Sequence, residues 1–333
     1  MRRGLGAAAL LLAATPALAN DSTAELAAGG LVLTRSAQIR MASEDLFVSA
    51  TEVRVRYHFR NLTDHPITAR VAFPMPDVIS TEEPLGVPTE NPENLLDFAT
   101  LADGVPVRAQ AEQKAVVEGV DRTALLRGLG VPLAPHLGLT RDAMDRLTPA
   151  QQKQLLDLGV VRPDEYDAGK GWERHLAPLW TLKTAYHWEQ TFPAGRDLVV
   201  DHRYKPATGG SVGTLVGSAR YAADAEGRAE IAKYCMDRGF LAAATRTRKP
   251  GQDFAPLSEQ RIAYVLKTGA NWAGPIGDFS LTVDKGAAAN LVSFCAEGVR
   301  KFGPTLFQVK KTNFTPARDL DILILVPNPE LAN

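Results

Sequence analysis

The feature that most constrains the fold is a strict alternation of apolar and polar residues between residues 52 and 73. Apolar side chains occupy every second position over residues 53–59, and the alternation resumes over residues 67–73 after a polar turn. Because successive side chains of a strand point to opposite faces, each run predicts a strand with one buried face. Together the two runs predict an antiparallel hairpin in a mainly β protein.

Further runs with strand character extend over most of the chain. The turn Ala102-Asp103-Gly104 predicts a second hairpin, and apolar runs recur until residues 320–326. Residues 206–217 are rich in Gly and small side chains, which is typical of a linker. We therefore predict two β-sandwich-like domains, at residues 20–205 and 218–333, with a Gly-rich linker at residues 206–217.

One stretch of the first domain, at about residues 116–178, breaks the strand pattern and predicts a small helical insertion. Within it, Thr148-Pro149-Ala150-Gln151 is a capping box with proline at the first helical position, and leucines follow before Gly159. A second capping box, Ser22-Thr23-Ala24-Glu25, predicts a short helix that ends at Gly29-Gly30.

Residues 1–19 have the organisation of a secretory signal peptide. Met1-Arg2-Arg3 is a positive start, residues 5–14 are almost wholly Ala and Leu, and Ala17-Leu18-Ala19 is a cleavage pattern. The apolar run is shorter than the roughly 20 residues that span a bilayer. We predict export to the periplasm by the general secretory route, cleavage after Ala19 and no membrane span; the alternative is a buried N-terminal helix.

Charge and cysteine content narrow the class of protein. The chain has 37 basic and 38 acidic residues, so it offers no basic patch for nucleic acid. Its two cysteines, Cys235 and Cys295, predict a disulfide in an exported chain. A redox pair or metal ligands are the alternatives, but neither C-x-x-C spacing nor a nearby His accompanies them. The sequence therefore predicts no metal and no cofactor.

Aromatic and apolar side chains around the insertion are the candidate binding residues. Tryptophans in a loop-rich region line ligand grooves in some proteins and anchor cores in others. Residues 130–137 are apolar without a helical period, which predicts a partner or ligand surface if they are exposed and a cap on the sandwich if they are buried. The candidate surface comprises Trp172, Trp180, Trp188, Trp272, Leu133 and His136.

Catalytic signals are weaker. Asp319 and Asp321 lie two residues apart, which places both carboxylates on one strand face, where they could bind a cation or perform acid–base chemistry. The leading hypothesis is a non-catalytic binding or interaction module whose partner is an envelope protein or a small ligand. The alternative is a periplasmic hydrolase that acts on an envelope polymer through carboxylates.

Several strings resemble a known family. Ser43-Glu44-Asp45-Leu46, Phe73-Pro74-Met75-Pro76 and Asn271-Trp272-Ala273-Gly274-Pro275-Ile276-Gly277 are similar to strings of the exported bacterial domain of unknown function family 4424. That resemblance implies a periplasmic address and no assigned activity. A fainter likeness, in Phe73-Pro74-Met75-Pro76 and Glu112-Gln113-Lys114-Ala115, is to the vault–inter-alpha-trypsin domain, which implies a β-sandwich with an interaction role.

Overall fold

The computed structural model describes residues 21–27, 30–80, 85–167, 169 and 171–331. The predicted signal peptide lies outside these residues. The mainly β fold is confirmed, and among the described residues no helix is long and apolar enough to cross a membrane.

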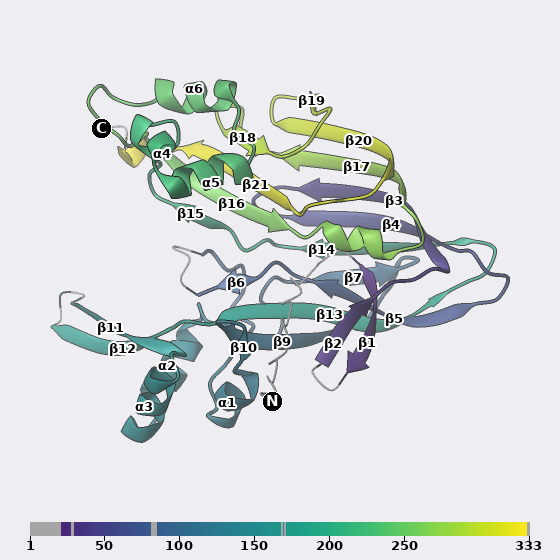
Figure 1. The fold of residues 1–333 in the computed structure, drawn as a ribbon, viewed down its shortest axis with the longest axis horizontal. Helices are drawn as coiled ribbons and strands as arrows, with labels where there is room; N and C mark the ends of the chain where they lie inside the picture. Colours follow the sequence, from purple (N-terminus) through teal and green to yellow (C-terminus); the bar gives the residue numbers. More distant parts are fainter. Residues whose placement is uncertain (1–20, 28–29, 81–84, 168, 170, 332–333) are drawn as a thin grey trace, which may run out of the picture.

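The largest sheet, which we call the spanning sheet, has eight strands in the order β19-β20-β17-β3-β4-β14-β7-β8 (Figure 1). Strand β17 pairs with β3 in parallel, and every other neighbouring pair is antiparallel. The strands are β3 (Ile39–Val48), β4 (Val53–Asn61), β7 (Ala99–Ala102), β8 (Val105–Pro106), β14 (Asp197–Tyr204), β17 (Ile276–Asp284), β19 (Arg300–Lys301) and β20 (Leu306–Phe314).

Two smaller sheets cover the inner face of the spanning sheet. The first covering sheet has the order β10-β9-β13-β5-β1-β2, with β6 paired to β13, and the second has the order β15-β16-β21-β18. The first consists of β1 (Ser22–Ala27), β2 (Gly30–Thr34), β5 (Ile67–Pro74), β6 (Val78–Ile79), β9 (Gln110–Val117), β10 (Val120–Asp121) and β13 (Thr181–Phe192). The second consists of β15 (Gly209–Ser211), β16 (Leu257–Tyr264), β18 (Leu291–Phe294) and β21 (Leu320–Pro327).

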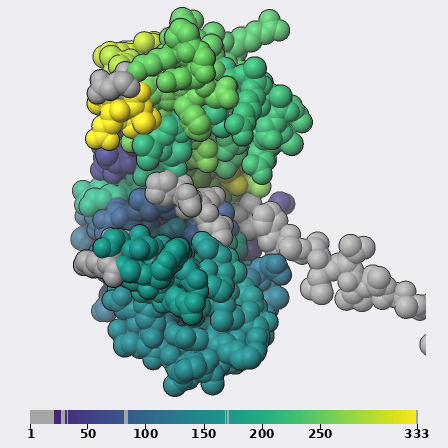
Figure 2. All heavy atoms as spheres, turned by 90° about the vertical axis from the view of Figure 1, so that its left-hand side faces the viewer, coloured from purple at the N-terminus to yellow at the C-terminus, as the bar shows by residue number. Residues whose placement is uncertain are grey.

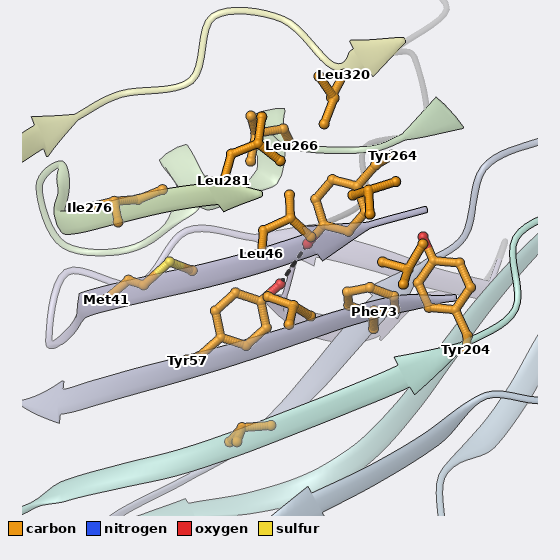
Figure 3. Close-up of a cluster of buried hydrophobic side chains, with 14 of the residues drawn as sticks. Met41, Leu46, Tyr57, Phe73, Tyr204, Tyr264, Leu266, Ile276, Leu281 and Leu320 are labelled. Atoms are coloured by element: carbon orange, nitrogen blue, oxygen red, sulfur yellow. Dashed lines mark hydrogen bonds between the residues drawn. The ribbon is translucent and has the colours of Figure 1, made fainter. Parts of the chain in front are cut away.

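One continuous core joins the three sheets. In β4 the buried positions alternate with arginines and a histidine on the outer face, as the sequence predicts. The hydroxyl of Tyr57 in β4 lies 3.0 Å from that of Tyr264 in β16, and Figure 3 shows this bond between the two sheets. The ring of Phe73, from the first covering sheet, contacts Tyr264 at 6.5 Å between centroids. The spanning sheet and the two covering sheets are therefore packed against one another around one core.

The predicted hairpin of residues 53–59 and 67–73 is wrong. Strand β4 pairs with β3 and β14, whereas β5 pairs with β1 and β13 in another sheet. The turn between them carries the chain across the core. Alternation shows that one face of a strand is buried, but it does not show whether the next strand lies beside it or across the core from it.

The predicted domain boundary also needs correction. Strands β17 and β20 follow residues 206–217 in the chain, yet they complete the sheet that β3 and β4 begin. The supposed linker contains β15, which pairs with β16. Packing explains the glycine at position 210 of this segment, because a Cβ atom on Gly210 would lie 2.1 Å from the carbonyl oxygen of Glu259. The protein is two sandwich-like halves that share one sheet.

Of the two helices predicted from capping boxes, one is present and the other is a strand. The insertion contains α1 (Thr123–Gly128), α2 (Gly138–Asp145) and α3 (Pro149–Asp157), and the capping box of Thr148 is confirmed. The insertion also contains a hairpin of β11 (Val161–Asp167) and β12 (Trp172–Pro178), which we did not predict. The capping box at Ser22 is wrong, because β1 forms there and the Ser22 hydroxyl donates to the carbonyl of Thr34.

The remaining helices lie in the second half. They are α4 (Ala219–Ala223), α5 (Ala225–Lys233), α6 (Arg238–Arg246), and the short 3-10 helices η1 (Lys267–Asn271) and η2 (Pro329–Leu331). Figure 2 shows the two halves as lobes that meet at a narrower middle, with the insertion in the lower lobe.

Candidate ligand-binding groove

An apolar groove of about 1030 Å³ opens in the second half, between the spanning sheet and β18. Its walls come from β17 and β20 on one side and from β18, the residues after it and α6 on the other. In Figure 3, Leu266, Leu281 and Leu320 lie together where three elements meet at its floor. We call it the phenylalanine groove, after its rings Phe240, Phe279, Phe294, Phe307 and Phe314.

The groove stays open because the second covering sheet is too small to close it. The sheet has four strands, and its outermost strand, β18, is four residues long. On the facing sheet, β19 pairs with only Phe307 and Gln308 of β20. Phe294, Phe307 and Phe314 consequently remain only partly buried, although they belong to the inner surface.

A kink in two neighbouring strands shapes one end of the groove. Both Ile276 and Phe279 of β17 face inward, so the alternation slips by one residue at Gly277. A Cβ atom on Gly277 would lie 2.3 Å from the carbonyl oxygen of Ala42, which explains the glycine. Opposite this site, Asn313 of β20 has a φ of 50°, a conformation that Asn tolerates better than most residues. The ring of Phe314 then packs on Phe279, with 4.6 Å between centroids.

A buried cation lies at the other end of the groove, beside Phe307. The ammonium of Lys285 donates to the carbonyls of Ala288, at 2.7 Å, and Asn290. The Lys285 side chain is buried, and Lys301 lies nearby with its ammonium 6.0 Å from the centroid of the Phe307 ring. Burial, and secondarily the charge of Lys301, lower the pKa of Lys285. This end of the groove is therefore positively charged.

The carboxylates that line the groove are held by structural contacts. Asp237 caps α6 by accepting from the backbone N–H of Phe240. Asp319 accepts from the N–H groups of Leu266 and Lys267, each at 3.1 Å. Glu297 is almost wholly exposed and lies 3.4 Å from Lys311. Asp237 and Asp319 are therefore part of the scaffold, whereas Glu297 is a surface ion-pair partner.

The predicted disulfide between Cys235 and Cys295 is confirmed, and it borders the groove. It ties the second residue after α5 to the first residue after β18. The guanidinium of Arg318 lies beside it and donates to the carbonyl of Lys233 at 3.0 Å. The bond therefore holds one wall of the groove against the helices of the second half.

Most of the predicted binding residues lie in the core, and apart from the contact of Trp180 with Leu133 they are not brought together. Trp180, Trp188 and Trp272 are buried, and the indole N–H of Trp180 donates to the carbonyl of Leu133, which is buried too. The buried indole N–H of Trp272 likewise donates to a backbone carbonyl, that of Asp21, at 2.6 Å. These contacts match the interpretation of the tryptophans as core anchors.

The other two predicted residues occupy separate places in the first half. The imidazole of His136 lies 3.0 Å from the carbonyl of Ile79 and is only partly buried. Trp172 is 76% exposed at the start of β12. Sequence reasoning missed the groove, although phenylalanines and valines at alternate positions of residues 279–283 and 307–309 carried a signal for it. That pattern by itself predicts only strands.

A second, smaller cavity of about 420 Å³ lies between the halves, and Asp319 and Asp321 both line it. Its charged side chains are held in ion pairs, some of them with residues outside the lining. Arg261 bridges Glu230 and Glu259, at 3.1 and 2.5 Å, and Asp321 lies 3.5 Å from Lys233. Within the described part of the chain, no group of three His, Cys, Asp or Glu residues is placed to hold a metal ion.

Comparison with known proteins shows the family. The family model of the domain of unknown function DUF4424 matches residues 19–323, so the chain belongs to this family. No curated protein matches the sequence.

Two solved structures are distant likenesses of this chain. A "putative nutrient binding protein" from Legionella pneumophila is 17% identical, with a TM-score of 0.44, over 87% of this chain and 68% of that one. An M1 zinc metallopeptidase from Deinococcus radiodurans is 11% identical, with a TM-score of 0.22, over 87% of this chain and 43% of that one.

Proposed function

We propose that this protein is an exported binding protein of the cell envelope that holds a small apolar ligand in the phenylalanine groove. The observation that carries the proposal is the open groove itself. Ligand sites are typically concave, mostly apolar and largely preformed, with a few placed polar groups, and their volumes are about 300–1,000 Å³. The groove is concave and mostly apolar, a few polar groups line it, and its volume of about 1030 Å³ is at the upper end of this range.

Binding without catalysis fits the state of the lining groups. The groove's carboxylates cap a helix, accept backbone N–H groups or pair with lysine. A general acid or base needs a proton-transfer group within hydrogen-bond reach of the substrate. Here Asp237 and Asp319 hold the walls in place, while the larger part of the surface offered to a ligand is aromatic and aliphatic.

Two observations support export to the periplasm. The disulfide is of the kind that persists in oxidising compartments. Asp21, two residues beyond the proposed cleavage position, is fully buried, and its backbone carbonyl accepts from Trp272. A leader that ends at Ala19 would leave a single residue before the chain enters the core. Sequencing the protein recovered from a periplasmic extract should give Asn20 as the first residue; an uncleaved chain in the cytoplasm would contradict export.

Calorimetric titration with a neutral apolar probe, dodecanol, tests the groove. We expect saturable binding with a negative heat-capacity change, which marks burial of apolar surface. The variant Phe307→Glu places a charge in the groove and should abolish binding. The matched control is Val105→Glu, on β8 at the far edge of the spanning sheet, where the side chain is 64% exposed. Equal binding by both variants would place the site elsewhere.

One observation favours a second function, docking of another envelope protein on the insertion. The hairpin of β11 and β12 projects from the body beside α2 (Figure 1). Trp172, at the start of β12, is 76% exposed. Tryptophan is enriched among the residues that dominate binding energy at interfaces. Trp172→Ala should reduce recovery of a co-purifying polypeptide from the periplasm without changing dodecanol binding. Unchanged recovery would exclude a role of this indole in docking.

A further inference from the structure

We propose that the ligand of the phenylalanine groove is an amphipathic anion, an unbranched apolar chain that ends in a carboxylate, with the carboxylate at the Lys285 end. This inference rests on the proposed function and narrows it to one chemical class.

The shape and lining of the groove suit an apolar chain. Its long walls are rows of inward side chains on antiparallel strands, such as Leu281 and Val309 on β17 and β20, which lie directly opposite each other. Facing them are Val292 and Phe294 of β18. Each methylene buried between such walls contributes about 0.8 kcal/mol, so a chain of ten or so methylenes suffices for firm binding.

The charges along the groove are unevenly placed. Three cations (Lys285, Lys311 and Arg318) and three carboxylates (Asp237, Glu297 and Asp319) line it, so the lining as a whole is neutral. At one end, however, Lys285 lies near a second cation, Lys301, whose ammonium is 6.0 Å from the centroid of the Phe307 ring. The excess of positive charge is confined to this end, and it attracts anions there.

The position of the carboxylate follows from Lys285. An ammonium has three N–H donors, and the two backbone carbonyls that Lys285 contacts take two of them. Among the residues that the structure describes, no carboxylate forms an ion pair with Lys285 or with Lys301. A buried cation without a counterion is unfavourable, so a ligand carboxylate that accepts the third donor would be held by a charge-assisted bond.

The opposite end of the groove is less suited to the headgroup. There Lys311 already has Glu297 as a counterion, and its ammonium lies 5.6 Å from the centroid of the Phe314 ring. Arg318 is exposed to solvent and donates to a backbone carbonyl beside the disulfide. Asp319 also lines this end and would repel a second carboxylate.

The experiment compares dodecanoate with dodecanol, which share a chain length and differ in the headgroup. Both are titrated calorimetrically into the full exported chain at neutral pH. We expect dodecanoate to bind at least about tenfold more tightly, the effect of one charge-assisted hydrogen bond. The preference should shrink as salt is added, because the mouth of the groove is exposed.

Variants locate the headgroup. Lys285→Met should remove the preference for dodecanoate and leave dodecanol binding intact, which also shows that the variant is folded. Lys301→Gln, at an exposed position, should weaken dodecanoate binding about threefold without any folding risk. The matched control is Lys310→Gln, on the outer face of β20, which should change neither affinity.

Every outcome decides between the proposals. Equal affinities for the acid and the alcohol would overturn the anion inference while the apolar site stands. Binding of neither probe would overturn both the site and the inference. A preference that survives Lys285→Met and Lys301→Gln but disappears in Arg318→Met would show that the headgroup lies at the other end, contrary to the proposal.

Discussion

The two halves of the molecule are built from the same kinds of side chain, but the aromatic rings are closed off from water in the first half and partly open to it in the second. In the first half four aromatic rings, Tyr57, Phe73, Phe98 and Trp188, surround the fully buried His202 at 4.7–5.6 Å between centroids. In the second half three phenylalanines of the groove, Phe294, Phe307 and Phe314, remain partly exposed.

The difference lies in how much sheet covers each half. The first covering sheet has seven strands. Asp21, directly before its strand β1, adds to this cover, and its carboxylate lies 3.0 Å from the imidazole of His202. The second has four strands, so part of the spanning sheet is left without a facing layer. An apolar inner face becomes a core where it is fully covered and a ligand groove where it is not, because nothing else excludes water from it.

Truncating one ring in each half gives the largest expected contrast. Phe73→Ala should lower the free energy of unfolding by about 3–5 kcal/mol, because the ring is fully buried and leaves a cavity. Phe307→Ala should lower it by less than about 2 kcal/mol, since a partly exposed ring loses less buried area, yet it should weaken dodecanol binding. Urea unfolding measures both. Similar losses would mean that the two halves are equally closed.

Removing the disulfide tests how the open half is held. The bond closes a loop with a sequence separation of 60 residues. The double variant Cys235→Ser with Cys295→Ser should lower the free energy of unfolding by about 3–4 kcal/mol. Hydrogen exchange should rise most in β18 and α6 and least around His202. A uniform rise over the whole chain would show that the halves open together.

The pH dependence of stability probes the closed half. Burial raises the pKa of the Asp21 carboxyl, and His202 partly opposes this shift. The folded state therefore binds the proton more tightly than the unfolded state does. The resulting stabilisation is complete below the unfolded carboxyl pKa of about 3.9 and is lost as the pH rises through the raised pKa. Asp21→Asn cannot titrate, so its stability should fall less between about pH 4 and pH 7. Urea unfolding at a series of pH values measures this. If the free energies of unfolding of Asp21→Asn and of the unchanged protein fell in parallel with pH, the assignment of this pH dependence to Asp21 would be contradicted.

The smallest expected effect on stability belongs to the insertion. Trp172→Ala should change the free energy of unfolding by less than about 0.5 kcal/mol, because the indole is exposed. Trp180→Ala, with a fully buried ring, should lower it by about 3–5 kcal/mol. Thermal unfolding of the two variants measures this contrast. A large loss for Trp172→Ala would mean that the hairpin packs more tightly than its exposure indicates.

Local patterns predicted elements well and partners poorly. The alternation at residues 53–59 correctly predicted a strand, but its supposed hairpin partner lies across the core in β5. The prediction of the candidate site had the same limit. Trp180, Trp188 and Trp272 drew attention as large aromatics and are core residues, whereas Phe307 and Phe314 line the groove. A single sequence shows which side chains face inward, but not whether anything faces them.

The sequence by itself determined the β-rich class, the disulfide and the helix at Thr148, because each depends on short-range geometry or on a pair of residues with no competitor. Tertiary structure decided the rest. Two capping boxes of equal quality had different outcomes: Thr148 starts a helix, whereas Ser22 became part of β1. Pairing with β2 and β5, and burial of Asp21, outweigh a local preference of about 1 kcal/mol. The groove likewise exists because distant strands leave one stretch of sheet uncovered.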